Sequence, residues 1–95
     1  MYPTSTAISS SLNPSTYGHV VTFTATVTAS GPYALTAKVS FKDGTTVIGT
    51  VALSGGVATL KKSNLTVGTH SITAQHLGDS SNAKSTSPAL NQVVQ

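Results

Sequence analysis

One eight-residue stretch, residues 21–28 (VTFTATVT), alternates strictly between apolar side chains and threonine. Successive side chains of an extended strand point to opposite faces, so Val21, Phe23, Ala25 and Val27 share one face and the four hydroxyls share the other. Threonine is β-branched, so it suits a strand while tolerating water on its outer side. The pattern therefore predicts a strand buried on one side only, as in a sandwich of two antiparallel sheets.

Turn-forming residues recur about every eight to twelve positions along the chain, the spacing typical of an all-β sandwich. Between these turns we predict seven strands and no helix, at residues 4–10, 20–29, 37–42, 46–53, 57–61, 69–77 and 85–94. Gly49 is predicted to mark a bulge or a close approach of another backbone, and Pro88 to place the last strand at an edge or a bulge. The predicted core consists of Val21, Phe23, Val27, Val39, Phe41, Leu53, Leu60, Ile72 and Ala74.

Three other side chains carry specific expectations. We predict that Ile8 is the main inward anchor of the first strand, which lies at an edge. Ser40 is predicted to point outward, because it alternates with the inward Val39 and Phe41. Tyr17 is predicted to pack under its own turn.

A chain of 95 residues is long enough for one domain with a modest core. We predict a single unit spanning residues 1–95, structured from about residue 4 to residue 94 and excised from a longer multidomain protein. The chain has no cysteine, so neither a disulfide nor a thiolate metal site can stabilise it. No apolar run approaches the roughly 18 residues that cross a bilayer, and the first residues lack the features of a signal peptide, so membrane insertion is not expected.

Charged residues are scarce, at 7% of the chain against about a quarter in typical proteins. The chain contains five lysines and two aspartates, and it lacks arginine and glutamate. Nucleic-acid surfaces usually combine clustered cations with aromatic side chains, whereas only Lys61 and Lys62 are adjacent here. We therefore expect no nucleic-acid partner, and we interpret the lysines as solvated positions that protect strand edges.

The chain resembles a known family through an ordered set of short segments. These are residues 13–18 (NPSTYG), 21–27 (VTFTATV), 39–44 (VSFKDG), 49–53 (GTVAL), 55–60 (GGVATL), 67–74 (VGTHSITA) and 78–80 (GDS). Together they are similar to the group 3 bacterial immunoglobulin-like repeat, which occurs in tandem in large secreted and surface proteins. The resemblance implies an all-β fold, a seven-stranded antiparallel immunoglobulin-like β-sandwich, and an extracellular or bacterial cell-surface location.

Two positions depart from the pattern of that family. Such repeats usually carry a tyrosine where this chain has His76, and an aromatic residue near Asn82. A tyrosine there would bury its ring and bond its hydroxyl to nearby backbone, as in the tyrosine corner of immunoglobulin folds. We therefore expect this corner to be less apolar than usual, with His76 half-buried in the tyrosine position.

The sequence argues against an enzyme. A Ser-His-Asp triad needs a carboxylate to orient the histidine, and only Asp43 and Asp79 are available, both next to a glycine in a predicted tight turn. The chain contains no Gly-x-Ser-x-Gly elbow. A carboxylate pair for glycoside cleavage has the same two candidates. We expect no catalytic residues and no cofactor.

Two groups of side chains are candidates for binding a metal ion. His70 and His76 share one face of a strand but lie roughly 20 Å apart at 3.3 Å per residue, too far to share a zinc ion directly. Asp79 and Asn82 could supply oxygen ligands to calcium, although calcium prefers six to eight oxygens with several carboxylates. A calcium site at this loop would need acids from a neighbouring domain, so we predict no metal site within the chain itself.

The leading hypothesis for function follows from the predicted number of strands. An odd number of strands that alternate in direction lets the chain enter at one pole and leave at the other, which suits units strung end to end. We predict a non-catalytic structural spacer module, stalk-like and monomeric when isolated, in a secreted or cell-surface bacterial protein such as an adhesin. Its partners would be neighbouring domains of the same chain.

The alternative is an accessory module that binds cell-surface carbohydrate or a host protein through loops or a sheet face. The fold hosts both roles, so the fold alone does not decide between them. Sugar binding usually needs exposed aromatic rings. Tyr33, in a loop beside Pro32, is the best aromatic candidate for ligand binding, and His76 is a further candidate.

Overall fold

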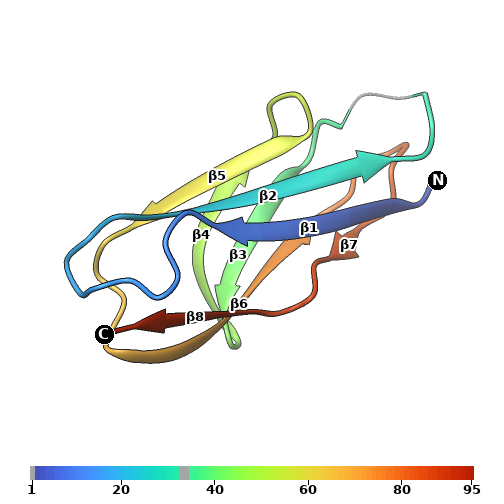
Figure 1. The fold of residues 1–95 in the computed structure, drawn as a ribbon. Helices are drawn as coiled ribbons and strands as arrows, with labels where there is room; N and C mark the ends of the chain where they lie inside the picture. The colour runs from blue at the N-terminus through green and yellow to red at the C-terminus, as the bar shows by residue number, and fades with distance from the viewer. Residues whose placement is uncertain (1, 33–34) are drawn as a thin grey trace.

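Two antiparallel sheets pack face to face in the computed structural model, which describes residues 2–32 and 35–95 (Figure 1). These residues form strands and no helix. The strands are β1 (Thr4–Ser10), β2 (Val21–Ala29), β3 (Lys38–Asp43), β4 (Thr46–Ala52), β5 (Val57–Lys62), β6 (Gly68–His76), β7 (Ser85–Thr86) and β8 (Leu90–Val94). The first sheet has the order β1-β2-β5, and the second has the order β4-β3-β6 with both β7 and β8 paired to β6. The predicted all-β antiparallel sandwich is confirmed.

The described residues form eight strands instead of seven, because the predicted last strand is divided. Thr86 of β7 faces Gln75, so an unbroken register would place Ala89 opposite Ile72, but Leu90 takes that place. The interruption thus contains one extra residue, at Pro88, which has no N–H for the ladder. Ser87 compensates, since its N–H donates to the Ala74 carbonyl (2.8 Å) and its hydroxyl accepts the Ala74 N–H (2.9 Å). The bulge predicted at Pro88 is confirmed.

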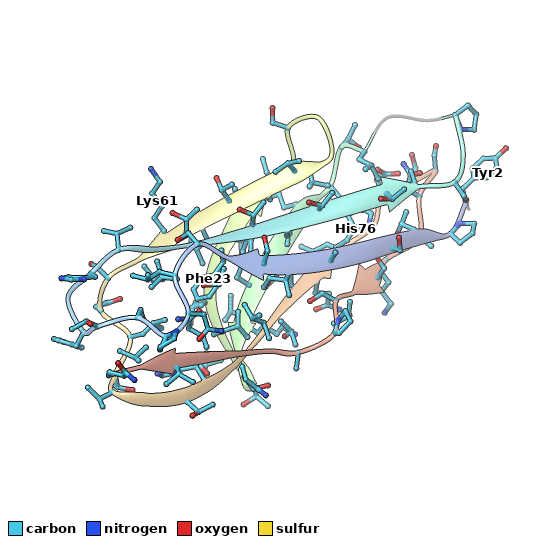
Figure 2. The ribbon with its side chains drawn as sticks, in the orientation of Figure 1. Tyr2, Phe23, Lys61 and His76 are labelled. Carbon is cyan, nitrogen blue, oxygen red and sulfur yellow. The ribbon has the colours of Figure 1, made fainter. Side chains whose placement is uncertain are left out.

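The core lies between the sheets and follows the alternation seen in the sequence. Val21, Phe23, Ala25 and Val27 of β2 are buried, whereas the threonines between them are partly or fully exposed. Phe23 lies between the layers, while Lys61 points outward from β5 (Figure 2). The buried apolar side chains are Val21, Phe23, Ala25, Val27, Val39, Phe41, Ala58, Ile72, Ala74 and Val94. Seven of the nine predicted core residues are in this set, and Leu53 and Leu60 are partly buried against it.

The strand β4 bends where it approaches the other sheet. Phe41 faces Gly49 while Lys42 faces Val47, so Ile48 is the extra residue of a bulge. A side chain at Gly49 would place its Cβ 2.6 Å from Cδ1 of Leu60, which lies on β5 of the opposite sheet. Gly49 thus marks both a bulge and a close approach, here of a side chain, and the prediction of irregularity at this glycine is confirmed.

Three side chains differ in burial from the sequence prediction. Ser40 lies on the outer face as predicted, opposite Thr50 and Gln75, but it is buried, because β3 is flanked by β4 and β6 and their side chains cover a residue as small as serine. Ile8 packs against the core as predicted but is only partly buried. The most buried side chain of β1 is Thr6, whose hydroxyl bonds to Ser85 across the gap between the sheets (2.6 Å). Tyr17 is 58% exposed and does not pack under its turn.

The domain is elongated, with principal extents of 42, 21 and 16 Å. The first strand begins at one end of the long axis and β8 finishes at the other (Figure 1). We call the end that carries Tyr2 and the β6–β7 loop the N-terminal pole. The opposite end, with the β1–β2 loop, the β5–β6 loop and Gln95, is the C-terminal pole. This agrees with the sequence argument for divergent ends, although the strand count behind that argument was one too low.

The one-sided burial predicts that a single substitution has different effects on two strands of the same sheet. Val39 is fully buried on β3 and Val47 is 53% exposed on β4. Val39→Thr places a hydroxyl in the core and should lower the free energy of unfolding by about 1–3 kcal/mol. Val47→Thr should change it by less than about 0.5 kcal/mol. Urea denaturation measures both, and equal losses would contradict the assignment of faces.

Candidate functional site

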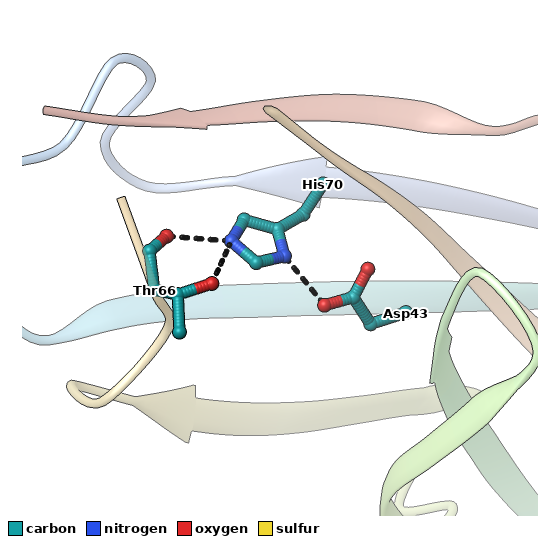
Figure 3. A network of polar contacts seen from close by, with 3 residues as sticks. All are labelled: Asp43, Thr66 and His70. Atoms are coloured by element: carbon teal, nitrogen blue, oxygen red, sulfur yellow. Dashed lines mark hydrogen bonds and ion pairs between the residues drawn. The ribbon is translucent and has the colours of Figure 1, made fainter. Parts of the chain in front are cut away.

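His70, the third residue of β6, is the centre of a polar cluster that also contains Asp43 and Thr66 (Figure 3). Its Nδ1 atom lies 2.5 Å from Oδ2 of Asp43, the last residue of β3. Its Nε2 atom lies 2.7 Å from the carbonyl oxygen of Thr66, in the loop before β6, and 3.4 Å from the hydroxyl of the same residue. The histidine side chain is 12% exposed and is therefore largely buried at this strand end.

This cluster contains the residue types of an acid–base–nucleophile triad but does not have its chemistry. In a triad, the histidine nitrogen that faces the hydroxyl must be free to accept a proton. Here Nε2 of His70 faces the Thr66 carbonyl at a shorter distance than the Thr66 hydroxyl. A carbonyl oxygen only accepts hydrogen bonds, so Nε2 carries the hydrogen and donates it. The cluster fastens the β5–β6 loop to the end of β3 and does not activate a nucleophile.

Both nitrogens of His70 face acceptors, which favours the doubly protonated ring. The Thr66 carbonyl makes the largest contribution and raises the pKa of His70. Burial opposes this by disfavouring the charge, and the hydrogen bond and charge of Asp43 raise the pKa further. The net result is a pKa above the ordinary value of 6.5.

Asp79 organises the β6–β7 loop at the N-terminal pole. Its Oδ1 accepts the N–H groups of Ser81 (2.9 Å) and Asn82 (2.8 Å). Its Oδ2 accepts the N–H (3.1 Å) and hydroxyl (3.2 Å) of Thr36, in the connection between β2 and β3. The amide nitrogen of Asn82 lies 3.2 Å from each carboxylate oxygen. These bonds, led by that from Ser81, hold the pKa of Asp79 well below its usual range.

The two residues named as calcium candidates do lie together, since Asp79 and Asn82 are in direct contact. However, both carboxylate oxygens of Asp79 already accept N–H or O–H donors, and a cation would have to displace them. Across residues 2–32 and 35–95, no three histidine, cysteine or acidic side chains gather in a way that could hold a metal ion. This geometry favours a loop-forming role for Asp79.

His76 and Asn82 are fully buried at the same corner, so the prediction that His76 is half-buried was wrong. Nδ1 of His76 lies 3.1 Å from the carbonyl oxygen of Ala83 and 3.3 Å from the hydroxyl of Thr4, which itself donates to that carbonyl (2.8 Å). Because the carbonyl only accepts, Nδ1 carries the hydrogen. Nε2 of His76 is buried without a hydrogen-bond partner in the described part of the chain. A ligand could reach His76 only if this corner opened.

A second polar cluster, at the C-terminal pole, was missed by the sequence prediction. The side chain of Gln92 on β8 is fully buried, accepts a hydrogen bond from the Ser10 hydroxyl (2.6 Å) and donates to the Leu12 carbonyl (2.8 Å). Nearby, the amide of Asn13 donates to the Asn91 carbonyl (2.9 Å) and accepts the Val93 N–H (3.0 Å). The only indication in the sequence is that Gln92 and the buried Val94 are two residues apart, which places both side chains on the same face of β8.

The remaining aromatic candidates are at different places. Tyr33 lies outside the described residues. Tyr17 and Tyr2 are both exposed, at 58% and 42%, but they belong to opposite poles of the domain. They therefore form no common aromatic surface.

The comparisons with known proteins agree with this fold. The chain matches the family model of the bacterial Ig-like domain (group 3) over residues 8–95. The chain belongs to this family. A search of curated proteins gives no match to this Ig-like domain. Among solved structures, the Ig-like domain is similar to the fibronectin(III)-like modules of Clostridium thermocellum CbhA, with a TM-score of 0.71 and 24% identity over 94% of this chain and 93% of that one. At that identity the likeness shows the fold alone.

The raised pKa of His70 predicts how the stability of the Ig-like domain changes with pH. The contribution of protonated His70 is complete below its ordinary pKa of 6.5 and is lost as the pH rises through the raised value. Urea denaturation between about pH 5 and pH 9 should show a fall in the unfolding free energy that His70→Gln and Asp43→Asn both reduce. A wild-type profile in either variant would refute the coupling.

Occupation of the Asp79 carboxylate by hydrogen-bond donors predicts the response to calcium. Adding about 1 mM calcium, the weak end of protein calcium sites, should leave the melting temperature of the isolated domain unchanged. Differential scanning calorimetry with magnesium as the control ion checks this. A rise specific to calcium, absent in Asp79→Asn, would establish the metal site instead.

Proposed function

We propose that this Ig-like domain is a non-catalytic structural spacer module of a secreted or cell-surface bacterial protein. The observation that carries the proposal is the placement of its first and last segments at opposite poles of a 42 Å long axis (Figure 1). Modules with that geometry extend a polypeptide without doubling back. Bacterial Ig-like families are typical of extracellular and surface proteins, which supports the location, and a stalk in an adhesin is the specific context that we propose.

Backbone hydrogen bonds anchor both ends of the module. Tyr2 donates to the Ser81 carbonyl (2.9 Å) and accepts the Ala83 N–H (2.8 Å). At the other pole, Ser15 donates to the Val93 carbonyl (2.8 Å) and accepts the Gln95 N–H (2.7 Å). Each pairing is a parallel bridge between a segment near the start of the chain and one near its end. The chain therefore leaves each pole from a fixed position.

This parallel arrangement determines how the module responds to force. Pulling on both ends draws residues 13–17 toward the N-terminal pole through β1 and draws residues 91–95 in the opposite direction. The bonds joining the two segments lie across the direction of pull, so they are loaded in shear, together and not one at a time. Asn13 contributes two of them through its side chain. This geometry supports a load-bearing spacer.

The surface gives less support to the alternative of a binding module. Of its two candidate residues, His76 is fully buried and Tyr33 lies outside the described residues. Among the described residues, no helix has the length and hydropathy needed to cross a membrane. A hydrolase is disfavoured by the hydrogen-bonded state of His70 Nε2.

The spacer proposal predicts that removing the Asn13 side chain weakens the module under load. Asn13→Ala deletes two hydrogen bonds to β8 and should lower the free energy of unfolding by about 1–3 kcal/mol. It should also lower the unfolding force in single-molecule pulling through the two ends. Asn64→Ala is the matched control, because Asn64 is exposed in the β5–β6 loop.

Two outcomes would count against the proposal. The first is an unfolding force that Asn13→Ala leaves unchanged. The second is an equal loss of force in Asn13→Ala and Asn64→Ala. Either result would show that the parallel segment does not bear the load.

A further inference from the structure

The C-terminal pole presents a group of exposed apolar side chains on two loops. We call Leu12, Tyr17, Val20 and Val67 the apolar cap. Leu12, Tyr17 and Val20 belong to the β1–β2 loop, and Val67 belongs to the β5–β6 loop. Their exposed fractions are 42%, 58%, 56% and 68%, respectively. These are half of the eight large apolar side chains exposed in the described part of the chain, and a concentration of exposed apolar residues at one place is a feature of interaction surfaces.

The cap is held in place by the same bonds that anchor the end of the chain. The Tyr17 N–H donates to the Gln95 carbonyl (2.9 Å), and Val67 precedes Gly68, which pairs with Val94. Tyr17 also lies beside Leu65 and Lys62, where the surface leaves almost no room for a small molecule. The cap is therefore an anchored surface with no room for a small ligand beside Tyr17.

The opposite pole is concave. A hollow of about 460 Å³ lies in the β6–β7 loop and is lined by Leu77, Gly78, Asp79, Asn82, Ala83 and Lys84. Leu77 is 47% exposed at this hollow. The hydrogen bonds of Asp79 fix the shape of the loop. A hollow of this size is large enough for an aromatic side chain, and Lys84 at its wall can pair with a ring face.

We propose that the apolar cap of one copy of this domain docks onto the β6–β7 hollow of the next copy, with Tyr17 as the anchor. The proposal rests on the spacer function proposed above and names the partner surface of each module. An exposed apolar patch at one end and a hollow at the other make a heterologous contact, which repeats into a linear array. Gln95 leaves from within the cap, and Tyr2 enters beside the loop that forms the hollow, so a following copy carries its hollow close to the cap.

The contact is expected to be weak between separate molecules and effective within one chain. Joining two copies replaces free association by a local concentration in the millimolar range for a short linker. The isolated domain therefore stays a monomer, as expected from the sequence. In tandem, docking would hold successive modules in a fixed relative orientation and stiffen the stalk.

The test uses two copies of the chain joined by about ten flexible Gly/Ser residues, compared with a single copy by amide ¹H–¹⁵N chemical shifts. We expect shift changes at the cap of the first copy and at the hollow of the second. Tyr17→Ser in the first copy should abolish both sets of changes. The same substitution in the second copy is the matched control and should have no effect, because that cap faces no partner.

Reciprocal variants make the test independent of any one side chain. Leu77→Ser in the second copy should abolish the changes, whereas Leu77→Ser in the first copy should not. In a single copy, Tyr17→Ser and Leu77→Ser should each leave the unfolding midpoint close to wild type, because both side chains are exposed.

Shift changes confined to residues beside the linker, or changes along β4, would overturn docking. That outcome would leave the spacer proposal standing as a flexible string of modules, since the pulling experiment on a single copy tests the spacer separately.

Discussion

The structure depends on backbone hydrogen bonds between parallel segments, which join the start of the chain to its end. Segments far apart in sequence meet at both poles, through Tyr2 with residues 81–83 and Ser15 with residues 93–95. Between the poles, the hydroxyls of Thr4 and Thr6 bond to Ser85 across the two sheets (2.9 and 2.6 Å). One side of the sandwich is thereby closed along its length. The burial of the core and the divergence of the ends both follow from this closure.

Hydroxyl and amide groups make the contacts that close this side of the sandwich, because the chain has few charged side chains. Ser85 accepts a hydrogen bond from the Thr4 hydroxyl of the other sheet, and the Ser87 hydroxyl accepts the Ala74 N–H beside Pro88, where the ladder is interrupted. Gln92 uses its buried amide in the same way at the other pole. Buried polar groups are tolerated when they are bonded, so a serine- and threonine-rich chain can join its sheets without ion pairs. The pair of His70 and Asp43 is the exception, and it lies at a strand end.

Alternation made most of the fold predictable, because it reports on each strand separately. It identified the buried face of β2, while the residue types of Gly49 and Pro88 identified the irregular positions. It could not identify contacts between strands. His70 and Asp43 are 27 residues apart, and Gln92 and Ser10 are 82 apart, so their pairing depends on register and sheet packing. The burial of Ser40 was not predictable for the same reason, since Ser40 lies on the outer face as expected and is covered by side chains of the neighbouring strands.

The central claim is that the two poles are held at opposite ends of a rigid long axis by the bonds between the first and last segments. The chain has no cysteine, so a pair of spin labels can be attached to Thr16→Cys and Ser80→Cys, at exposed positions of the two poles. Double electron–electron resonance should give one narrow distance distribution approaching the 42 Å long dimension. Asn13→Ala should broaden it. A short distance, or a broad distribution in the unsubstituted background, would contradict the account.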